Sequence, residues 1–365
     1  MSLHANIGGV QKQSTDVWCN IGGVWKKANK LMVNIGGVWK DGGLARLLSY
    51  YGTAAPFGTG GYARSPIMGL SVGNYALFGG SYYSTNVNAY GTSLAMTTPT
   101  VFSLARSEYA VASVGSYGLF GGGKNGNTGD ISAVVDAYST SLARTTPTAL
   151  TNATGRLAGA SVGGYALFAG GANANTVVNA YNTSLVRSSP TALSEGRYDF
   201  AGASVGDYAL FAGGTGGTNI FRSSVNAYNT SLVRSSPTAL SVARMELAGA
   251  SINGYALFAG GRATGYKASA VVDAYNTSLV RSTPTALSSG GGRFVSASLV
   301  DYALFGVDTV MNAYNTSLVR SIPTALSVPR NQLGGASVGN YALFGGGRLT
   351  GTSTDSAVVD VYQAI

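Results

Sequence analysis

The sequence has few charged residues, one cysteine, one histidine and no long apolar run. Charged residues make up 10% of its 365 residues, against about a quarter in an ordinary soluble domain. The single cysteine, Cys19, excludes an internal disulfide framework. With a single histidine, His4, the chain has almost no residues from which to build a classical metal site or a serine–histidine catalytic site. We therefore expect no catalytic residue, no metal and no cofactor.

Membrane, secretion and nucleic-acid signals are also missing. No apolar stretch approaches the roughly 20 residues of a membrane span, and the N-terminus MSLHANIGGV lacks the segments of a secretion signal. The net charge is +9, but the basic residues are dispersed, so we expect no nucleic-acid partner. What the chain does contain is 45% hydrophobic residues, 53 glycines and 22 tyrosines. This composition suffices for one large or two small domains with a real core.

A short repeat occupies residues 1–41. The motif Asn-Ile-Gly-Gly-Val begins at positions 6, 20 and 34, with a period of 14. Both glycines of a two-residue turn can take positive φ, so each copy predicts one tight β-hairpin. Hairpins this short need a partner surface. Three tryptophans mark a docking face for attachment, unless they pack on each other or on the following domain: Trp18, Trp25 and Trp39.

A longer repeat occupies residues 42–365. Each copy contains an apolar strand such as Tyr165-Ala166-Leu167-Phe168, followed in most copies by a glycine pair, and the strand tyrosine recurs at positions 75, 117, 165, 208, 255, 302 and 341. Four short β-prone segments separated by turn residues make up each copy, and helical periodicity is absent. This pattern predicts an all-β fold, a seven-bladed β-propeller in which each blade buries its faces against its neighbours.

Closure of the ring is also predicted. The last copy ends at Ile365, directly after its third strand, whereas Leu44-Ala45-Arg46 matches the fourth-strand segment Leu142-Ala143-Arg144. An open sheet edge would otherwise stay unpaired. We expect residues 44–50 to supply the fourth strand of the last blade.

The long units resemble kelch repeats, in which a glycine pair follows an apolar strand and a tyrosine ends the next strand, as in Gly170-Gly171 with Tyr181. The family's tryptophan after that tyrosine is missing, and the sixth copy has Gly306-Val307 instead of the glycine pair. A kelch-like arginine stands eleven residues before the strand tyrosine in most copies: Arg64, Arg106, Arg197, Arg244 and Arg330. A repeated residue at one fixed position is expected to be structural.

The N-terminal units resemble short Asn-Ile-Gly-Gly-Val-Trp-Lys repeats of bacteriophage and prophage tail and baseplate proteins. Near-identical blades and few charges are similar to phage receptor-binding fibres. The resemblance implies a virion protein of the tail tip or baseplate that is made in the bacterial host cytoplasm and contacts other tail or baseplate proteins. Pairing of the hairpins with their own copies, giving a homo-oligomer, is an alternative.

Variation between the long copies is confined to two connections. The segment after the glycine pair and the segment before the first strand vary, whereas the turns Ser-Val-Gly-Gly and Asn-Thr-Ser hardly change. In a four-stranded meander the two variable connections emerge on one side and the constant turns on the other. Divergent loops on a rigid scaffold are typical of recognition surfaces. We expect this side to bind a bacterial surface glycan, with a protein partner as the alternative.

Glycan recognition uses aromatic rings, planar amides and arginines. The variable connections carry such side chains, and our candidate ligand-binding residues are Tyr82, Tyr83, Lys124, Asn125, Asn127, Asn173, Asn175, Phe221, Arg222, Arg262, Tyr266, Lys267 and Arg348. The alternative is that several of them pack only against their own loops.

Two other function classes stay open, a freestanding lectin-like or protein-interaction propeller and a glycan-cleaving enzyme. A glycosidase needs a pair of carboxylates, and no spacing links Asp199, Asp207, Asp301 and Asp308. A second set of acids occupies a position that other copies give to asparagine, which favours a structural hydrogen bond: Asp136, Asp273 and Asp360.

Four Asn-Thr-Ser triplets, at positions 182, 229, 276 and 315, match a glycosylation acceptor. Turn chemistry explains them better, because asparagine tolerates positive φ and bonds its own backbone.

Overall fold

The computed structural model describes residues 47–57 and 67–365, together with the strand backbones between residues 4 and 41. The chain divides into two compact units, Met1–Leu47 and Leu48–Ile365. The described residues form β-strands and one 3-10 helix, η1 (Thr264–Tyr266), with no α-helix among them. The predicted all-β class is confirmed.

The first unit contains three antiparallel hairpins, as the 14-residue period predicts. They pair β1 (His4–Ile7) with β2 (Val10–Gln13), β3 (Trp18–Ile21) with β4 (Val24–Lys27), and β5 (Met32–Ile35) with β6 (Val38–Asp41). In each hairpin the isoleucine before the glycine pair lies opposite the valine after it. The side chains of Trp18, Trp25 and Trp39 lie outside the described part of the chain, so the docking face stays a prediction.

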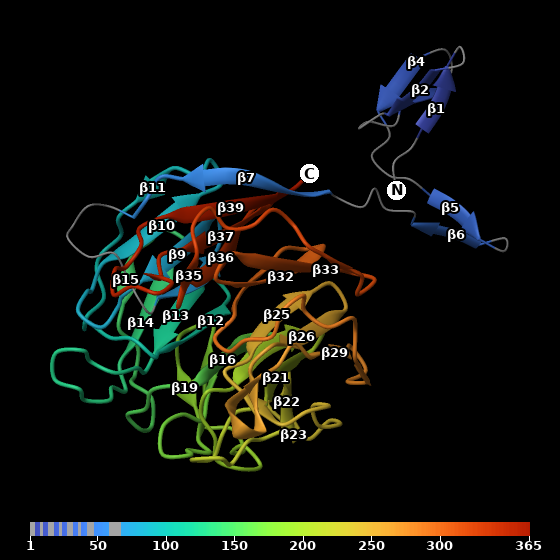
Figure 1. Cartoon of the computed structure of the whole chain (residues 1–365). Helices are drawn as coiled ribbons and strands as arrows, with labels where there is room; N and C mark the ends of the chain where they lie inside the picture. Colours follow the sequence, from blue (N-terminus) through green and yellow to red (C-terminus); the bar gives the residue numbers. More distant parts are fainter. Residues whose placement is uncertain are drawn as a thin grey trace. The chain divides into compact units, whose positions relative to one another are not determined.

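The second unit, within residues 48–57 and 67–365, contains seven four-stranded antiparallel sheets, here called I to VII (Figure 1). Sheets I to IV are β8 (Met68–Val72), β9 (Tyr75–Gly79), β10 (Val87–Gly91) and β11 (Met96–Thr97); β12 (Ala110–Val114), β13 (Tyr117–Gly121), β14 (Val135–Ser139) and β15 (Arg144–Thr145); β16 (Ala158–Val162), β17 (Tyr165–Ala169), β18 (Val178–Asn182) and β19 (Arg187–Ser188); β20 (Ala201–Val205), β21 (Tyr208–Ala212), β22 (Val225–Asn229) and β23 (Arg234–Ser235). Sheets V to VII are β25 (Ala248–Ile252), β26 (Tyr255–Ala259), β29 (Val272–Asn276) and β30 (Arg281–Ser282); β31 (Val295–Ser298), β32 (Tyr302–Val307), β33 (Val310–Asn315) and β34 (Arg320–Ser321); β36 (Gly334–Val338), β37 (Tyr341–Gly345), β39 (Val359–Ala364) and β7 (Leu48–Ala54).

The hydrophobic core lies between neighbouring sheets. One cluster joins Ala203 and Leu210 of sheet IV to Phe258 and Tyr275 of sheet V, and each of the other neighbouring pairs has an equivalent cluster. The second strand of every sheet is apolar on both faces, because a sheet lies against each face. Sheets that bury both faces only against their neighbours form a propeller-like arrangement.

The first strands of the seven sheets contact one another in a closed cycle. Each contributes one serine to a ring of hydrogen bonds between sheets. Ser204 donates its backbone N–H to Ser251 Oγ (2.8 Å) and its hydroxyl to the Ser161 carbonyl (2.6 Å), and Ser337 N–H donates to Ser71 Oγ (2.9 Å) where the two ends of the ring meet. The strands approach closely: a Cβ on Gly202 would lie 2.1 Å from the Gly159 carbonyl oxygen.

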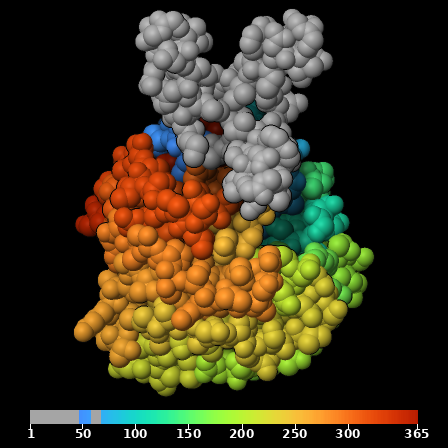
Figure 2. Space-filling view, turned by 90° about the vertical axis from the view of Figure 1, so that its right-hand side faces the viewer, coloured from blue at the N-terminus to red at the C-terminus, as the bar shows by residue number. Residues whose placement is uncertain are grey.

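Strand β7 completes sheet VII by pairing with β39. In Figure 2 the blue atoms of residues 47–57 lie against the red atoms of the C-terminal part. The predicted closing strand is therefore right in kind and wrong in register, since it begins at Leu48 and extends to Ala54. Tyr50 stands opposite Tyr362, as Arg144 stands opposite Tyr138. The match of Leu44-Ala45-Arg46, which lies outside the described residues, placed the strand four residues too early.

The register of β7 is set by side-chain chemistry. Tyr50 donates its hydroxyl to Asp360 Oδ1 (2.7 Å), as Arg144 Nη1 donates to Asp136 Oδ1 (2.8 Å) in sheet II. Burial, together with Asp360, raises the pKa of Tyr50 to about 12. A tyrosine thus takes the place of the fourth-strand arginine.

The repeated arginine is structural, as predicted. Four copies are fully buried, and each donates Nη2 to the carbonyl of the phenylalanine in the second strand of its own sheet, at 2.9 to 3.1 Å: Arg106, Arg197, Arg244 and Arg330. Three of these arginines also pair with the buried acids of the third strand, which confirms the structural role of Asp136, Asp273 and Asp360. Arg64 lies outside the described residues.

The constant turns lie at one end of the sheets. The side-chain oxygen of Asn276 accepts from the backbone N–H of Ser278 (3.0 Å) and Val280 (2.9 Å), and the other three triplets repeat this pattern. Turn chemistry is thus correct, but the expected positive φ belongs to the following leucine, at 60° in Leu279. Constant turns of neighbouring sheets meet, because a Cβ on Gly206 would lie 3.1 Å from Thr277 Cγ2.

Candidate functional site: the variable face

The opposite end of the sheets is formed by the variable connections, and it is called the variable face. It comprises residues 80–86, 122–134, 170–177, 213–224, 260–271, 308–309 and 346–358, with the links that precede the first strands. The two kinds of segment pair directly. Thr215 forms bridges to Tyr198 and Phe221, and β24 (Arg244–Met245) pairs with β27 (Arg262–Ala263). Both variable connections therefore emerge on one side, as the meander predicts.

Four candidate aromatic residues pair with each other on this face. Tyr82 donates its hydroxyl to Glu108 (3.0 Å), and burial together with Glu108 raises the Tyr82 pKa. The rings of Tyr82 and Tyr83 lie 6.2 Å apart. Phe221 of sheet IV and Tyr266 of sheet V lie edge to face at 5.4 Å, which joins two neighbouring connections.

The candidate asparagines divide between turn residues and exposed residues. Asn125 Oδ1 accepts from the N–H of Asn127 (2.8 Å), and Asn175 Oδ1 accepts from the N–H of Val177 (2.8 Å). These two side chains shape their own loops, as the alternative reading predicts. The residues Asn127 and Asn173 are exposed.

The candidate basic residues are largely ion-paired. Arg222 pairs with Glu195 (2.6 Å) and Arg348 with Asp355 (3.3 Å). Lys124 bridges Ser107 and Ile131 through its backbone. Lys267 is exposed at the start of β28 (Lys267–Ala268), and Arg348 at the start of β38 (Arg348–Leu349), which pairs with β35 (Arg330–Asn331).

Six residues of the links form a charged collar that sequence reasoning missed as a group. Each stands two residues after the position of the repeated arginine and has a φ between 53° and 60°: Glu108, Arg156, Asp199, Glu246, Arg293 and Gln332. The first five members are joined in succession by backbone hydrogen bonds, as in Glu246 N–H to the Asp199 carbonyl (2.8 Å). A left-handed non-glycine residue costs about 1–3 kcal/mol and such strain clusters at functional sites. The repeated offset from the arginine could have identified the collar.

Two acids of the collar, Asp199 and Glu246, are ion-paired with arginines. Arg156 pairs with Asp199, and its guanidinium carbon lies 4.3 Å from the Tyr198 ring centre. Burial raises the pKa of Asp199, and the hydrogen bond from Arg156 opposes that rise. Glu246 Oε1 accepts a hydrogen bond from Nε of Arg293 at 3.0 Å, and Nε of Arg262 forms an ion pair with the other carboxylate oxygen at 2.9 Å.

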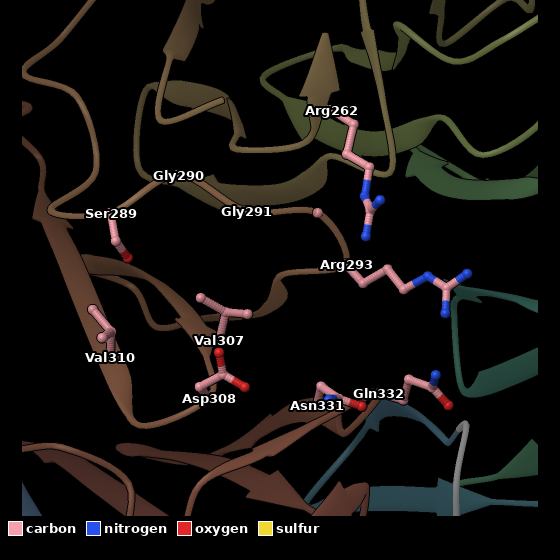
Figure 3. Close-up of a pocket in the computed structure, with 11 residues that line it drawn as sticks. Arg262, Ser289, Gly290, Gly291, Arg293, Val307, Asp308, Val310, Asn331 and Gln332 are labelled. Atoms are coloured by element: carbon pink, nitrogen blue, oxygen red, sulfur yellow. The ribbon is translucent and has the colours of Figure 1, made fainter. Parts of the chain in front are cut away.

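A cleft of about 540 Å³ opens beside Glu246, between the connections of sheets V, VI and VII (Figure 3). Its volume lies within the range of about 300–1,000 Å³ typical of small-molecule sites. In Figure 3, Arg262 and the backbone at Gly290 and Gly291 lie on one side of the cleft, and Asp308 and Asn331 lie on the other. The half-buried Val307 and Val310 form an apolar wall.

Of the predicted ligand-binding residues, Arg262 lines the cleft. The sequence marked residues 288–293 as variable, but it did not select Arg293, Asn331 or Gln332. The missing glycine pair at Gly306-Val307 is the signal that could have located the cleft. The four acids considered for hydrolysis are divided, since Asp199 and Asp308 belong to the variable face whereas Asp207 and Asp301 lie in constant turns.

The described part of the chain contains no group of three or more His, Cys, Asp or Glu residues placed to hold a metal ion. None of the helices found there has the length and apolar character needed to cross a membrane. No protein-family model matches the sequence, and no curated protein matches it either.

Proposed function

We propose that residues 48–365 form a seven-bladed, kelch-like β-propeller and that the chain is a bacteriophage or prophage receptor-binding protein. In this proposal the variable face binds a bacterial surface glycan, and the N-terminal hairpins attach the chain to other tail or baseplate proteins. The observation that carries the proposal is that the variable connections pair with the variable links at one end of the sheets, beside a polar cleft. The first strands of these sheets are joined in a ring by hydrogen bonds. Divergent loops on a rigid scaffold favour recognition over catalysis.

The glycan is favoured over other partners by the polar character of the face. Paired charges, amides and tyrosines line it, as in Glu246 with its two arginines, Asn331 and Tyr82. A hydrolytic mechanism would need two facing carboxylates, whereas Asp199 is engaged by Arg156 and Asp308 by Thr350 (2.7 Å). These contacts favour a binding role over hydrolysis.

Adsorption of the full chain to bacterial cells tests the proposal. Two variants carry a single reactive cysteine, in a Cys19→Ser background, at opposite ends of sheet IV: Thr218→Cys on the variable face and Ser231→Cys in the constant turn, both exposed. Each is coupled to a bulky polyethylene glycol. We expect the conjugate at position 218 to lose adsorption and the conjugate at 231 to keep it. Equal adsorption by both conjugates, or no adsorption of the unmodified chain to any strain, would contradict the proposal.

Capture of the full chain by purified tail particles tests the attachment role. We expect the double variant Trp25→Ser, Trp39→Ser to lose capture while its adsorption to cells is unchanged. Capture by neither protein would favour a freestanding lectin-like module.

A further inference from the structure

Sheet VI differs from its neighbours in a way that creates the cleft. Strands β32 and β33 are joined by two residues, Asp308 and Thr309, whereas the shortest of the other connections spans residues 80–86. In sheets II and IV the connection lies along the link that precedes its own sheet, through the bridges Ser107–Lys124 and Tyr198–Thr215. Sheet VI has no such segment to cover its link, residues 289–293. The space beside that link is therefore an inherent feature of the chain.

The walls of the cleft are polar and electrically balanced. Arg293 donates Nε to Glu246 and Arg262 forms an ion pair with it; the Glu246 side chain is 10% exposed, and the two arginine side chains are about half exposed. Asp308 supplies one further carboxylate and accepts a hydrogen bond from Thr350. The set thus contains two guanidinium groups and two carboxylates, so its formal charge is zero.

This balance selects the kind of ligand. An anionic ligand would have to compete with Glu246 for the arginines and would approach Asp308, whereas a hydroxyl can donate to Asp308 and accept from a guanidinium or the Asn331 amide. A hydrogen bond to a charged group contributes more than one between neutral groups. Val307 and Val310 offer an apolar surface to the C–H face of a sugar ring.

We infer that the cleft binds neutral pyranose residues through Arg262, Asp308 and Asn331. This inference rests on the proposed glycan-binding function and names its site and its ligand class. The bound sugar has no charged group.

Calorimetric titration of the full chain with defined trisaccharides tests the inference. The probes are neutral trisaccharides of glucose, galactose and mannose, and matched trisaccharides in which one residue is a uronic acid. Val307→Trp fills the cleft, and Val319→Trp is its matched control, because Val319 belongs to the same sheet but is exposed in the constant turn. We expect at least one neutral probe to bind, a loss of at least tenfold in affinity for Val307→Trp, and a change of less than twofold for Val319→Trp.

A second variant guards against an effect of folding. Asp308→Asn keeps the left-handed backbone, at φ 53°, because asparagine adopts it readily. We expect it to weaken the neutral probe severalfold and to strengthen the uronic acid probe, since one negative charge is removed.

Three results would overturn the inference: equal affinity of Val307→Trp and Val319→Trp, tighter binding of the uronic acid probes by the unmodified chain, or no binding of any neutral probe. Each can occur while the conjugate at position 218 still blocks adsorption to cells, and the proposed function would then stand. Failure of the unmodified chain to adsorb would instead reject the proposed function, and the titrations would still decide on the cleft.

Discussion

Sheets V and VI are neighbours with nearly the same strands. In sheet VI, both the link before the first strand and the connection between β32 and β33 line the open cleft, whereas sheet V contributes only its connection, through Arg262. In sheet V, Arg244 is fully buried and pairs with Asp273 (2.8 Å), and the connection 260–271 covers the variable face. In sheet VI, Gly291 and Asn312 occupy the two corresponding positions, and the connection has two residues. The strands thus define the scaffold, while the connections and the buried pair change from sheet to sheet.

The buried aspartate of the third strand occurs only in copies that also have the repeated arginine. Asp occurs in sheets II, V and VII, where the arginine is present, and Asn occurs in sheets III and VI, where Thr154 and Gly291 replace the arginine. Sheet IV combines Arg197 with Asn226, and burial lowers the pKa of Arg197 to about 10 although Glu195 opposes that shift. A buried carboxylate without its partner is costly, which explains why the aspartate never occurs in a copy that lacks the arginine, whereas the arginine also occurs with asparagine in sheet IV and in the sequence of the first copy, at Arg64 and Asn88.

Removing the arginine of sheet V should have the largest effect. Arg244→Met leaves Asp273 buried without its partner, and we expect a loss of about 3–5 kcal/mol in the free energy of unfolding. The double variant Arg244→Met, Asp273→Asn imitates sheet VI and should recover most of that loss. The control is Arg281→Met, which removes a partly exposed arginine that lies 3.7 Å from the same carboxylate. We expect this variant to lose about 1 kcal/mol or less in the free energy of unfolding. Urea unfolding measures all three, and equal losses for the two single variants would refute the coupling.

The third-strand tyrosines should make the fold sensitive to alkali. Tyr314 of sheet VI donates its hydroxyl to the Thr285 carbonyl (2.7 Å), and burial raises its pKa to about 12. Burial also raises the pKa of Tyr275 in sheet V, where Asp273 adds to the rise. The native state keeps these protons above pH 10, where the unfolded chain loses them. The stabilisation that comes from these raised pKa values is therefore fully present below about pH 10 and is lost as the pH rises through 12.

The variant Tyr314→Phe sharpens this difference between the two sheets. We expect the free energy of unfolding to fall by about 1 kcal/mol at pH 8, because the hydrogen bond is missing. Above pH 10 the free energy of unfolding should fall less steeply with pH than in the unmodified chain, by the slope of about one proton. Urea midpoints between pH 8 and 12 measure both. An unchanged alkaline slope would show that Tyr314 does not titrate with folding.

The smallest effect is expected on the exposed connection of sheet V. Tyr266→Ala removes an edge contact with Phe221 from a residue that is 45% exposed, and the unfolding free energy should change by about 0.5 kcal/mol or less. A loss comparable with that of Arg244→Met would mean that this connection belongs to the scaffold.

The repeats allowed much of the scaffold to be predicted. The hairpins, the four-stranded units and the closing strand follow from local patterns that recur. The register of β7 could not be predicted, because it depends on a bond between Tyr50 and Asp360 at opposite ends of the chain. The cleft was missed because it arises where a segment is absent, between residues of three sheets. No single repeat contains that arrangement.

Hydrogen–deuterium exchange of the full chain, with and without envelope polysaccharide from a strain to which it adsorbs, tests the glycan-binding variable face most directly. We predict slower exchange in residues 260–271, 288–294 and 308–309, and unchanged exchange in the constant turns at residues 276–280 and 315–319. Protection of the constant turns, or of neither face, would contradict the account.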